Sequence, residues 1–216
     1  MKKIYIFLFL SVLLFSGCTS GGKSKAETAD LTHTEAIYIE HGSTNVHIKS
    51  TDQSKLEASH PKPIIEMKQG KKEISIHAKK SKFHIGPKIN FNKKLHVNIP
   101  KDYQGKIIIN GASGNITTEG IETEHIEAMT KSGDISLDFG HFHSDVHAKT
   151  TSGNVELLFN EKKPDIHLTT KTASGRQMVA IPLSISRQDD KKMEGTSGDG
   201  KYKVEIETAS GNITVK

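Results

Sequence analysis

Apolar and polar residues alternate along much of this chain, and one arrangement of them returns four times. Each time, an aliphatic pair two positions apart is followed, nine residues after its first member, by a second aliphatic run. The first members are Ile107, Ile126, Val146 and Val204, and the second runs begin at Ile116, Ile135, Val155 and Ile213. Alternation with a period of two is typical of a strand with one buried face. The pattern predicts paired strands joined by a short polar bend.

The four bends share a serine, a glycine and then an amide or acid. They are Ser113, Gly114, Asn115; Ser132, Gly133, Asp134; Ser152, Gly153, Asn154; and Ser210, Gly211, Asn212. Glycine lets the backbone bend at little steric cost, and Asn or Asp tolerates similar conformations. The first three bends are spaced by 19 and 20 residues. A repeat of this period predicts an all-β, single-domain parallel β-solenoid with a period of about 20 residues, in which stacked units bury one continuous core.

Three further segments are imperfect copies of the unit. Ser43 to Val46 has threonine where the others have glycine, and it follows Ile37 and Ile39 at the regular spacing. Ser174-Gly175 lies eight residues after Ile166 rather than six, so we expect a bulge or a change of register there. Ser197 to Gly200 has no aliphatic residue after it, which indicates a turn between strands.

The acid or amide of each bend has two interpretations. If neighbouring coils pair as strands do, Asn115, Asp134 and Asn154 would lie about 4.8 Å apart and could form a ladder of hydrogen bonds. Alternatively, each side chain serves only its own turn. Neither interpretation makes these residues catalytic.

The first residues predict export. Lys2 and Lys3 precede an apolar run from Ile4 to Phe15, which is too short for a membrane-spanning helix, and small residues follow. The segment Leu14-Phe15-Ser16-Gly17-Cys18 resembles the lipobox of bacterial lipoproteins, apart from Phe15 where leucine is commonest. The resemblance implies that residues 1–17 are removed and that the Cys18 sulfur carries a diacylglycerol. Because Cys18 is the only cysteine, an internal disulfide is excluded, and the alternatives are pairing between chains or removal with the signal.

The rest of the chain divides into a tether and one domain. Residues 18–30 lack apolar periodicity and are expected to form a flexible tether. Residues 31–216 are expected to form the β-solenoid domain, with more regular repeats over 105–216. Its less regular first half has candidate strands at 64–67, 74–76, 83–85 and 95–99. No segment shows a helical stripe.

The charge and composition of the chain argue against nucleic acid as a partner. The formal charge of +5 becomes +5 − 2 = +3 without Lys2 and Lys3, and only Arg176 and Arg187 are arginines. Few arginines, no tryptophan and export speak against nucleic-acid binding. Lysine and glutamate are interleaved, which favours an ordinary soluble surface over a patch for anionic lipids or wall polymers.

The repeats also resemble those of a known family. The segment from His96 to Tyr103, which contains Ile99-Pro100, and the closing segment from Gly195 to Val215 are similar to the bacterial "putative adhesin" family of β-strand-repeat envelope proteins. The resemblance covers roughly Ala36 to Lys216. It implies an extended, right-handed β-solenoid with a surface role, and it supplies no catalytic residues.

Histidines offer a second hypothesis. His141 and His143 are two apart, so on a strand they would face the same way and could hold a metal ion, with His147 or Asp145 completing the site. Most of the twelve histidines are scattered singly beside inward aliphatic residues, and we expect these to face solvent and to respond to pH near 6.5.

A third hypothesis is a carbohydrate-active enzyme. Asp134 and Asp138 are four apart and would point the same way on a straight strand, but no further acid or base converges on them. The chain has no GxSxG, HExxH or phosphate-binding glycine loop. We therefore expect a non-catalytic protein without a cofactor.

The interpretation favoured by the sequence is an exported protein, anchored by lipid on the extracytoplasmic face of the membrane, that presents its solenoid surface. Its partner would be an envelope protein, a wall polymer or a peptide. A sensing role in envelope stress, the oligomeric state and pairing at a solenoid edge stay open.

Overall fold

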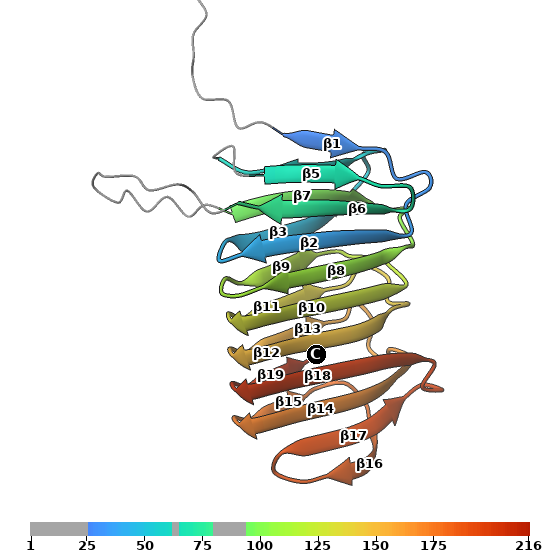
Figure 1. The fold of residues 1–216 in the computed structure, drawn as a ribbon. Helices are drawn as coiled ribbons and strands as arrows, with labels where there is room; N and C mark the ends of the chain where they lie inside the picture. Colours follow the sequence, from blue (N-terminus) through green and yellow to red (C-terminus); the bar gives the residue numbers. More distant parts are fainter. Residues whose placement is uncertain (1–25, 62–64, 80–93) are drawn as a thin grey trace, which may run out of the picture.

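Two β-sheets face each other across a single core. The computed structural model describes residues 26–61, 65–79 and 94–216, and every regular element in these ranges is a β-strand. The strands lie roughly perpendicular to the long axis of the molecule, one above the other (Figure 1). The all-β prediction is confirmed. Among the described residues there is no helix long and apolar enough to cross a bilayer.

One sheet has nine strands and the other has ten. In spatial order, the nine-stranded sheet consists of β1 (Glu27–Ala29), β4 (Leu56–Ser59), β7 (Lys94–Pro100), β3 (Asn45–Thr51), β9 (Ile116–Glu119), β11 (Ile135–Asp138), β13 (Val155–Leu158), β19 (Ile213–Val215) and β15 (Gln177–Val179). The ten-stranded sheet consists of β16 (Ser184–Gln188), β17 (Lys192–Ser197), β14 (Ile166–Ser174), β18 (Tyr202–Ser210), β12 (Asp145–Ser152), β10 (His125–Ser132), β8 (Lys106–Gly111), β2 (Ala36–Gly42), β6 (Glu73–Ala78) and β5 (Ile65–Gln69).

The predicted alternation decides which side chains enter the core. In β10, Ile126 and Ala128 are fully buried, whereas Glu127 and Met129 face outward. Aliphatic residues of neighbouring strands stand in line, so that Ile107, Ile126 and Val146 are register partners. Each strand from β8 to β13 thus contributes two or three inward residues to a narrow core between the sheets.

Most neighbouring strands are parallel and belong to successive coils. We define a coil as one strand of the ten-stranded sheet together with the next strand of the nine-stranded sheet along the chain. In spatial order the coils are β6/β7, β2/β3, β8/β9, β10/β11, β12/β13, β18/β19 and β14/β15. The middle coils follow the chain, but the order is exchanged at both ends. The last coil of the chain, β18/β19, lies between two earlier ones, and Figure 1 marks the C-terminus inside the stack.

Antiparallel strands cover both ends of the stack. At one end, β4 pairs with β7, β1 pairs with β4, and β5 pairs with β6; at the other, β17 pairs with β14 and β16 pairs with β17. The strand β1 lies inside the predicted tether, and its Ala29 is buried. The folded part therefore begins before residue 31, the boundary predicted from the sequence.

The imperfect copies have different outcomes. The bulge expected near Ser174-Gly175 is wrong, because β14 pairs with β18 without a register shift from Ile166 to Thr172. Instead, Leu168 and Thr170 occupy the positions of Val204 and Ile206 in the neighbouring strand. The longer spacing arises because β14 begins at Ile166, two residues before the regular aliphatic pair. In the segment Ser197 to Gly200, Ser197 ends β17 and the chain turns at Gly198 and Asp199, as predicted. The strands β5, β6 and β7 match three of the four expected early strands; 83–85 lies outside the described residues.

Candidate functional site

The four predicted bends gather in one column at the ends of the ten-stranded sheet's strands. In this column, the side-chain oxygen of one coil accepts a hydrogen bond from the backbone N–H of the next. Asn45 accepts from Asn115 (2.9 Å), Asn115 from Asp134 (3.0 Å), Asp134 from Asn154 (2.8 Å), Asn154 from Asn212 (2.9 Å), and Asn212 from Arg176 (2.9 Å). The structure therefore shows the ladder rather than isolated turns. It stops at Arg176, whose side chain has no acceptor.

The glycines of these bends allow the coils to approach closely. A Cβ atom on Gly133 would lie under 3.0 Å from the carbonyl of Gly114, and the same holds for Gly153 over Gly133 and Gly211 over Gly153. Real Cβ atoms do not tolerate such distances. Backbone bonds continue through the serines, since the N–H of Gly153 donates to the carbonyl of Ser210 at 3.0 Å. The Ser-Gly residues are therefore structural.

Buried threonines support the same column, and the sequence interpretation missed them. The hydroxyls of Thr150, Thr208 and Thr172 donate to the carbonyls of Gly133, Gly153 and Gly211 at 3.1, 3.0 and 3.1 Å. These hydrogen bonds give the glycine carbonyls at the edge of the core a partner, and they therefore lower the free-energy cost of burying those carbonyls. The signal was present in the sequence, because each threonine lies two residues before a Ser-Gly.

The outer face of the ten-stranded sheet carries rows of paired charges. Lys149 on β12 contacts Glu207 on β18 at 2.8 Å, and Glu205 contacts Lys203 at 2.9 Å and His147 at 3.6 Å. The hydrogen bond from Lys149 holds the pKa of Glu207 below its ordinary value, and Lys203 lowers the pKa of Glu205 in the same way. The pairs that Lys149 and His147 form join two coils that are far apart in sequence, whereas Lys203 and Glu205 lie on the same strand. Together they leave a face of mixed sign.

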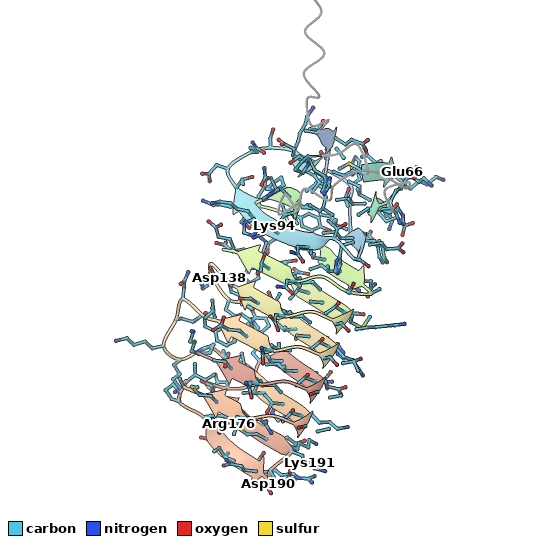
Figure 2. All side chains as sticks on the ribbon, turned by 90° about the vertical axis from the view of Figure 1, so that its left-hand side faces the viewer. Glu66, Lys94, Asp138, Arg176, Asp190 and Lys191 are labelled. Carbon is cyan, nitrogen blue, oxygen red and sulfur yellow. The ribbon has the colours of Figure 1, made fainter. Side chains whose placement is uncertain are left out.

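The outer face of the nine-stranded sheet brings two carboxylates side by side. Glu119 on β9 and Asp138 on β11 occupy adjacent coils, and Lys49 contacts Glu119. The ion pair with Lys49 lowers the pKa of Glu119, whereas burial and the neighbouring Glu119 charge raise the pKa of Asp138. Figure 2 shows Asp138 at the side of the stack, between Lys94 and Glu66 towards one end and Arg176 towards the other.

The predicted carboxylate pair of the enzyme hypothesis does not converge. Asp134 lies at the bend before β11, where its oxygen accepts the Asn154 N–H, and Asp138 ends that strand. At roughly 3.3 Å per residue, their backbones are about 13 Å apart. A pair of carboxylates that acts on one glycosidic bond needs a separation of about 5 to 9.5 Å. The structure therefore does not bring Asp134 and Asp138 together as an acid and a base.

The predicted metal ligands are also held by other partners. The rings of His141 and His143 are 5.9 Å apart, but both nitrogens of His143 contact protein oxygens, at 3.1 Å from the His141 carbonyl and 2.7 Å from Gln104 Oε1. His147 faces Glu205, and an Asp145 oxygen accepts the Lys203 N–H at 2.8 Å. In the part of the chain that the structure describes, no group of three or more His, Cys, Asp or Glu could hold a metal ion.

Two histidines depart from the predicted outward orientation. His41 and His60 are buried, with exposures of 0% and 2%. The ring of His41 fills the space that a side chain on Gly111 would occupy, and its Nδ1 lies 2.7 Å from the carbonyl of Thr44. Since that carbonyl is an acceptor, Nδ1 carries the proton and Nε2 is the unprotonated nitrogen. Burial lowers the pKa of His41, although the bond to Thr44 opposes this.

Together, these features define a class of protein. The chain forms two facing sheets of stacked coils, with polar outer faces and a structural column of turns. The Toastrack DUF4097 family model matches residues 32–138 and 118–216, and the chain belongs to this family. The family of strand-repeat proteins expected from the sequence is thereby confirmed.

One solved structure shows the same fold. A "putative cell adhesion protein" from Clostridium sporogenes is 16% identical, with a TM-score of 0.62, and the match covers 90% of this chain and 99% of that one. A "putative adhesin" from Bacteroides fragilis is 12% identical, with a TM-score of 0.36 and coverage of 90% and 98%. No curated protein matches the chain.

Proposed function

We propose that this protein is exported, anchored to the membrane through a lipid on Cys18, and presents the surface of its stack, including the end formed by β15 and β16, to another component of the cell envelope. Its winding is taken to be right-handed with a period of about 20 residues. The proposed role is binding or scaffolding and involves no catalysis. Cys18 lies outside the described residues, so the lipid anchor rests on the sequence pattern from Leu14 to Cys18.

The observation that carries the proposal is the place where the chain enters the stack. The first described strand, β1, is the edge of the nine-stranded sheet, and β15 is its opposite edge. An anchor at Cys18 would therefore attach to one end. Eight inter-strand spacings of roughly 4.8 Å place β15 about 40 Å from β1. Both outer faces would stand clear of the bilayer, as would the end of the stack formed by β15 and β16, which we call the far end.

The far end and the outer faces differ in chemistry. Two of the three exposed large hydrophobic side chains in the described ranges, Met178 and Ile185, lie on the edge strands β15 and β16. The outer face of the ten-stranded sheet is instead a mixed-charge surface, with pairs such as Lys149 and Glu207. Exposed apolar side chains on edge strands lie beside unpaired backbone groups, which can accept a partner strand, whereas the charges of the outer face already have partners. The far end is therefore the preferred contact region.

Anchoring and presentation are tested separately. Fractionation of cells is expected to find the unaltered chain with the membrane and the Cys18→Ser variant in the soluble extracytoplasmic fraction. A photo-crosslinking residue placed at Met178 or Ile185 is expected to capture an envelope component, whereas the same group at Lys131, on the side of the stack, serves as the control. Equal fractionation of both forms would contradict the anchor, and equal capture at all three positions would contradict the preferred end.

A further inference from the structure

The last coil of the chain occupies a slot formed entirely by earlier segments. β18 lies between β12 and β14, and β19 lies between β13 and β15 (Figure 1). Both neighbours of each strand are parallel to it. The slot thus offers two open strand edges in each sheet, and the segment from Tyr202 to Val215 satisfies all of them.

The contacts in the slot are extensive on both sides. Val204, Ile206, Ile213 and Val215 are fully buried. On one side, Asn212 N–H donates to Asn154 Oδ1 at 2.9 Å. On the other, the N–H of Gly211 donates to the carbonyl of Ser174 at 2.9 Å, and that of Ile213 donates to Arg176, also at 2.9 Å. Each partner belongs to an earlier part of the chain, so the same contacts would form with a segment from another copy.

Only a short turn ties the last coil to the rest. The turn from Gly198 to Lys201 passes over the beginning of β14 and joins β17, on one side of β14, to β18 on the other. Gly198 and Gly200 have φ values of 64° and 75°, which disfavour any other residue. Asp165 accepts the N–H groups of Asp199 (2.7 Å) and Lys201 (3.1 Å). The closed chain therefore depends on a turn conformation that two glycines permit.

We propose that the slot also accepts the last coil of a second copy, so that two chains exchange residues 202–216 and form a closed dimer. The core, the ladder and the strand pairing are the same in the exchanged dimer as in the monomer. Chain concentration and the strain in the turn therefore decide between the two forms. In the exchanged dimer the turn is straightened, so a residue that does not tolerate a positive φ is no longer strained.

The test introduces strain into the turn and detects exchange by whether an engineered disulfide forms within one chain or between two chains. The full chain carries Cys18→Ser together with Glu156→Cys and Thr214→Cys, which are register partners on the outer faces of β13 and β19. Gly198→Ala or Gly200→Ala is then added, in separate variants, to strain the turn. The control is Gly120→Ala, since Gly120 also has a positive φ of 61° but lies in a different turn with open space around it. Each variant is refolded at several protein concentrations, oxidised and run on a non-reducing gel.

Each turn variant is expected to raise the ratio of exchanged dimer to monomer by about thirtyfold over the control, because exchange relieves one strained residue in each of two turns. The Glu156→Cys/Thr214→Cys disulfide should then link two chains. With the unaltered turn, the linked fraction should rise with protein concentration, which tests the exchange without any strained residue. Disulfides that stay within one chain in every form and at every concentration would overturn the proposal, as would equal dimer in the Gly120→Ala control.

Discussion

The side-chain oxygen of Asn154 accepts the backbone N–H of Asn212 at 2.9 Å, although the two residues are 58 positions apart in the chain. This bond places the last coil directly beside the third regular bend. The coil formed by β14 and β15, which follows β12/β13 in sequence, lies one position further along the stack. The chain therefore runs to the end of the stack and returns to fill a position inside it.

The close approach of the bends predicts a large effect of one methyl group. Gly133→Ala would place a Cβ against the carbonyl of Gly114, in a backbone that cannot move without shifting two coils. We expect a loss of about 3 kcal/mol in the free energy of unfolding, as overpacking in a rigid site gives. Chemical denaturation measures it. Gly120→Ala, in open space, should cost about 1 kcal/mol from its positive φ alone, and equal losses would refute the steric argument.

The ladder predicts that the acceptor oxygen of Asp134 matters more than its charge. Asp134→Ala removes the partner of the Asn154 N–H and should lower the free energy of unfolding by about 1 kcal/mol. Asp134→Asn keeps an oxygen in the position that Asn115 uses in the neighbouring coil, and it should cost less. Ser136→Ala, on the outer face of the same strand, is the control. The ladder would lose its support if the Asn and Ala variants were equally destabilised.

Buried His41 predicts a loss of stability in acid. Burial lowers its pKa below the ordinary value of 6.5, so the unfolded chain binds a proton before the folded chain does. Stability from this residue is complete above pH 6.5 and decreases as the pH falls below it. Burial, and then the nearby cations, lower the pKa of His96, which acts in the same direction.

His41→Asn keeps a donor for the Thr44 carbonyl but does not titrate. Denaturation curves between pH 7.5 and pH 5 should therefore show a smaller decrease in stability for this variant than for the unaltered chain. His33→Asn, which removes an exposed imidazole, serves as the matched control. Parallel pH profiles for His41→Asn and the unaltered chain would show that His41 does not contribute.

Hydrogen exchange distinguishes an inserted coil from a fraying end. β18 is paired on both sides along its length, whereas β16 is an edge strand whose five residues are all exposed. Amides of Val204 to Thr208 should therefore exchange as slowly as those of Val146 to Thr150 in β12. Amides of β16 should exchange much faster. Rapid exchange in β18 would indicate that the last coil detaches easily.

Local pattern predicted the coil, but it did not predict the order of the coils. The spacing from Val204 to Ile213 is the same as that from Val146 to Val155, so the sequence identifies both as strand–bend–strand units. Identical spacing fits any neighbour equally well, and nothing in it decides whether Ser210 pairs with Ser152 or only with Ser174. The order depends on long-range closure by the β16–β17 hairpin, where the periodicity is weak.

The residues of the candidate sites also divide into those that local sequence predicted and those that depend on contacts between coils. The bend residues were found because glycine and Asn or Asp have strong local preferences, whereas the buried orientation of His41 depends on the absent side chain of Gly111 in the neighbouring coil. The outward phase assigned to most histidines holds for His47 and His77, which face glutamates of adjacent coils. Contacts between coils are set by register, which a single repeat does not encode.

Disulfide trapping tests the exchanged order of coils most directly. In a chain carrying Cys18→Ser, Lys149→Cys and Glu207→Cys are register partners on adjacent strands, whereas Lys149→Cys and Lys171→Cys are separated by the intervening strand β18. Two strand spacings, about 10 Å, are too far for a disulfide. The account predicts rapid, complete oxidation of the first pair and none of the second. Oxidation of the second pair but not the first would show that the coils follow the order of the chain.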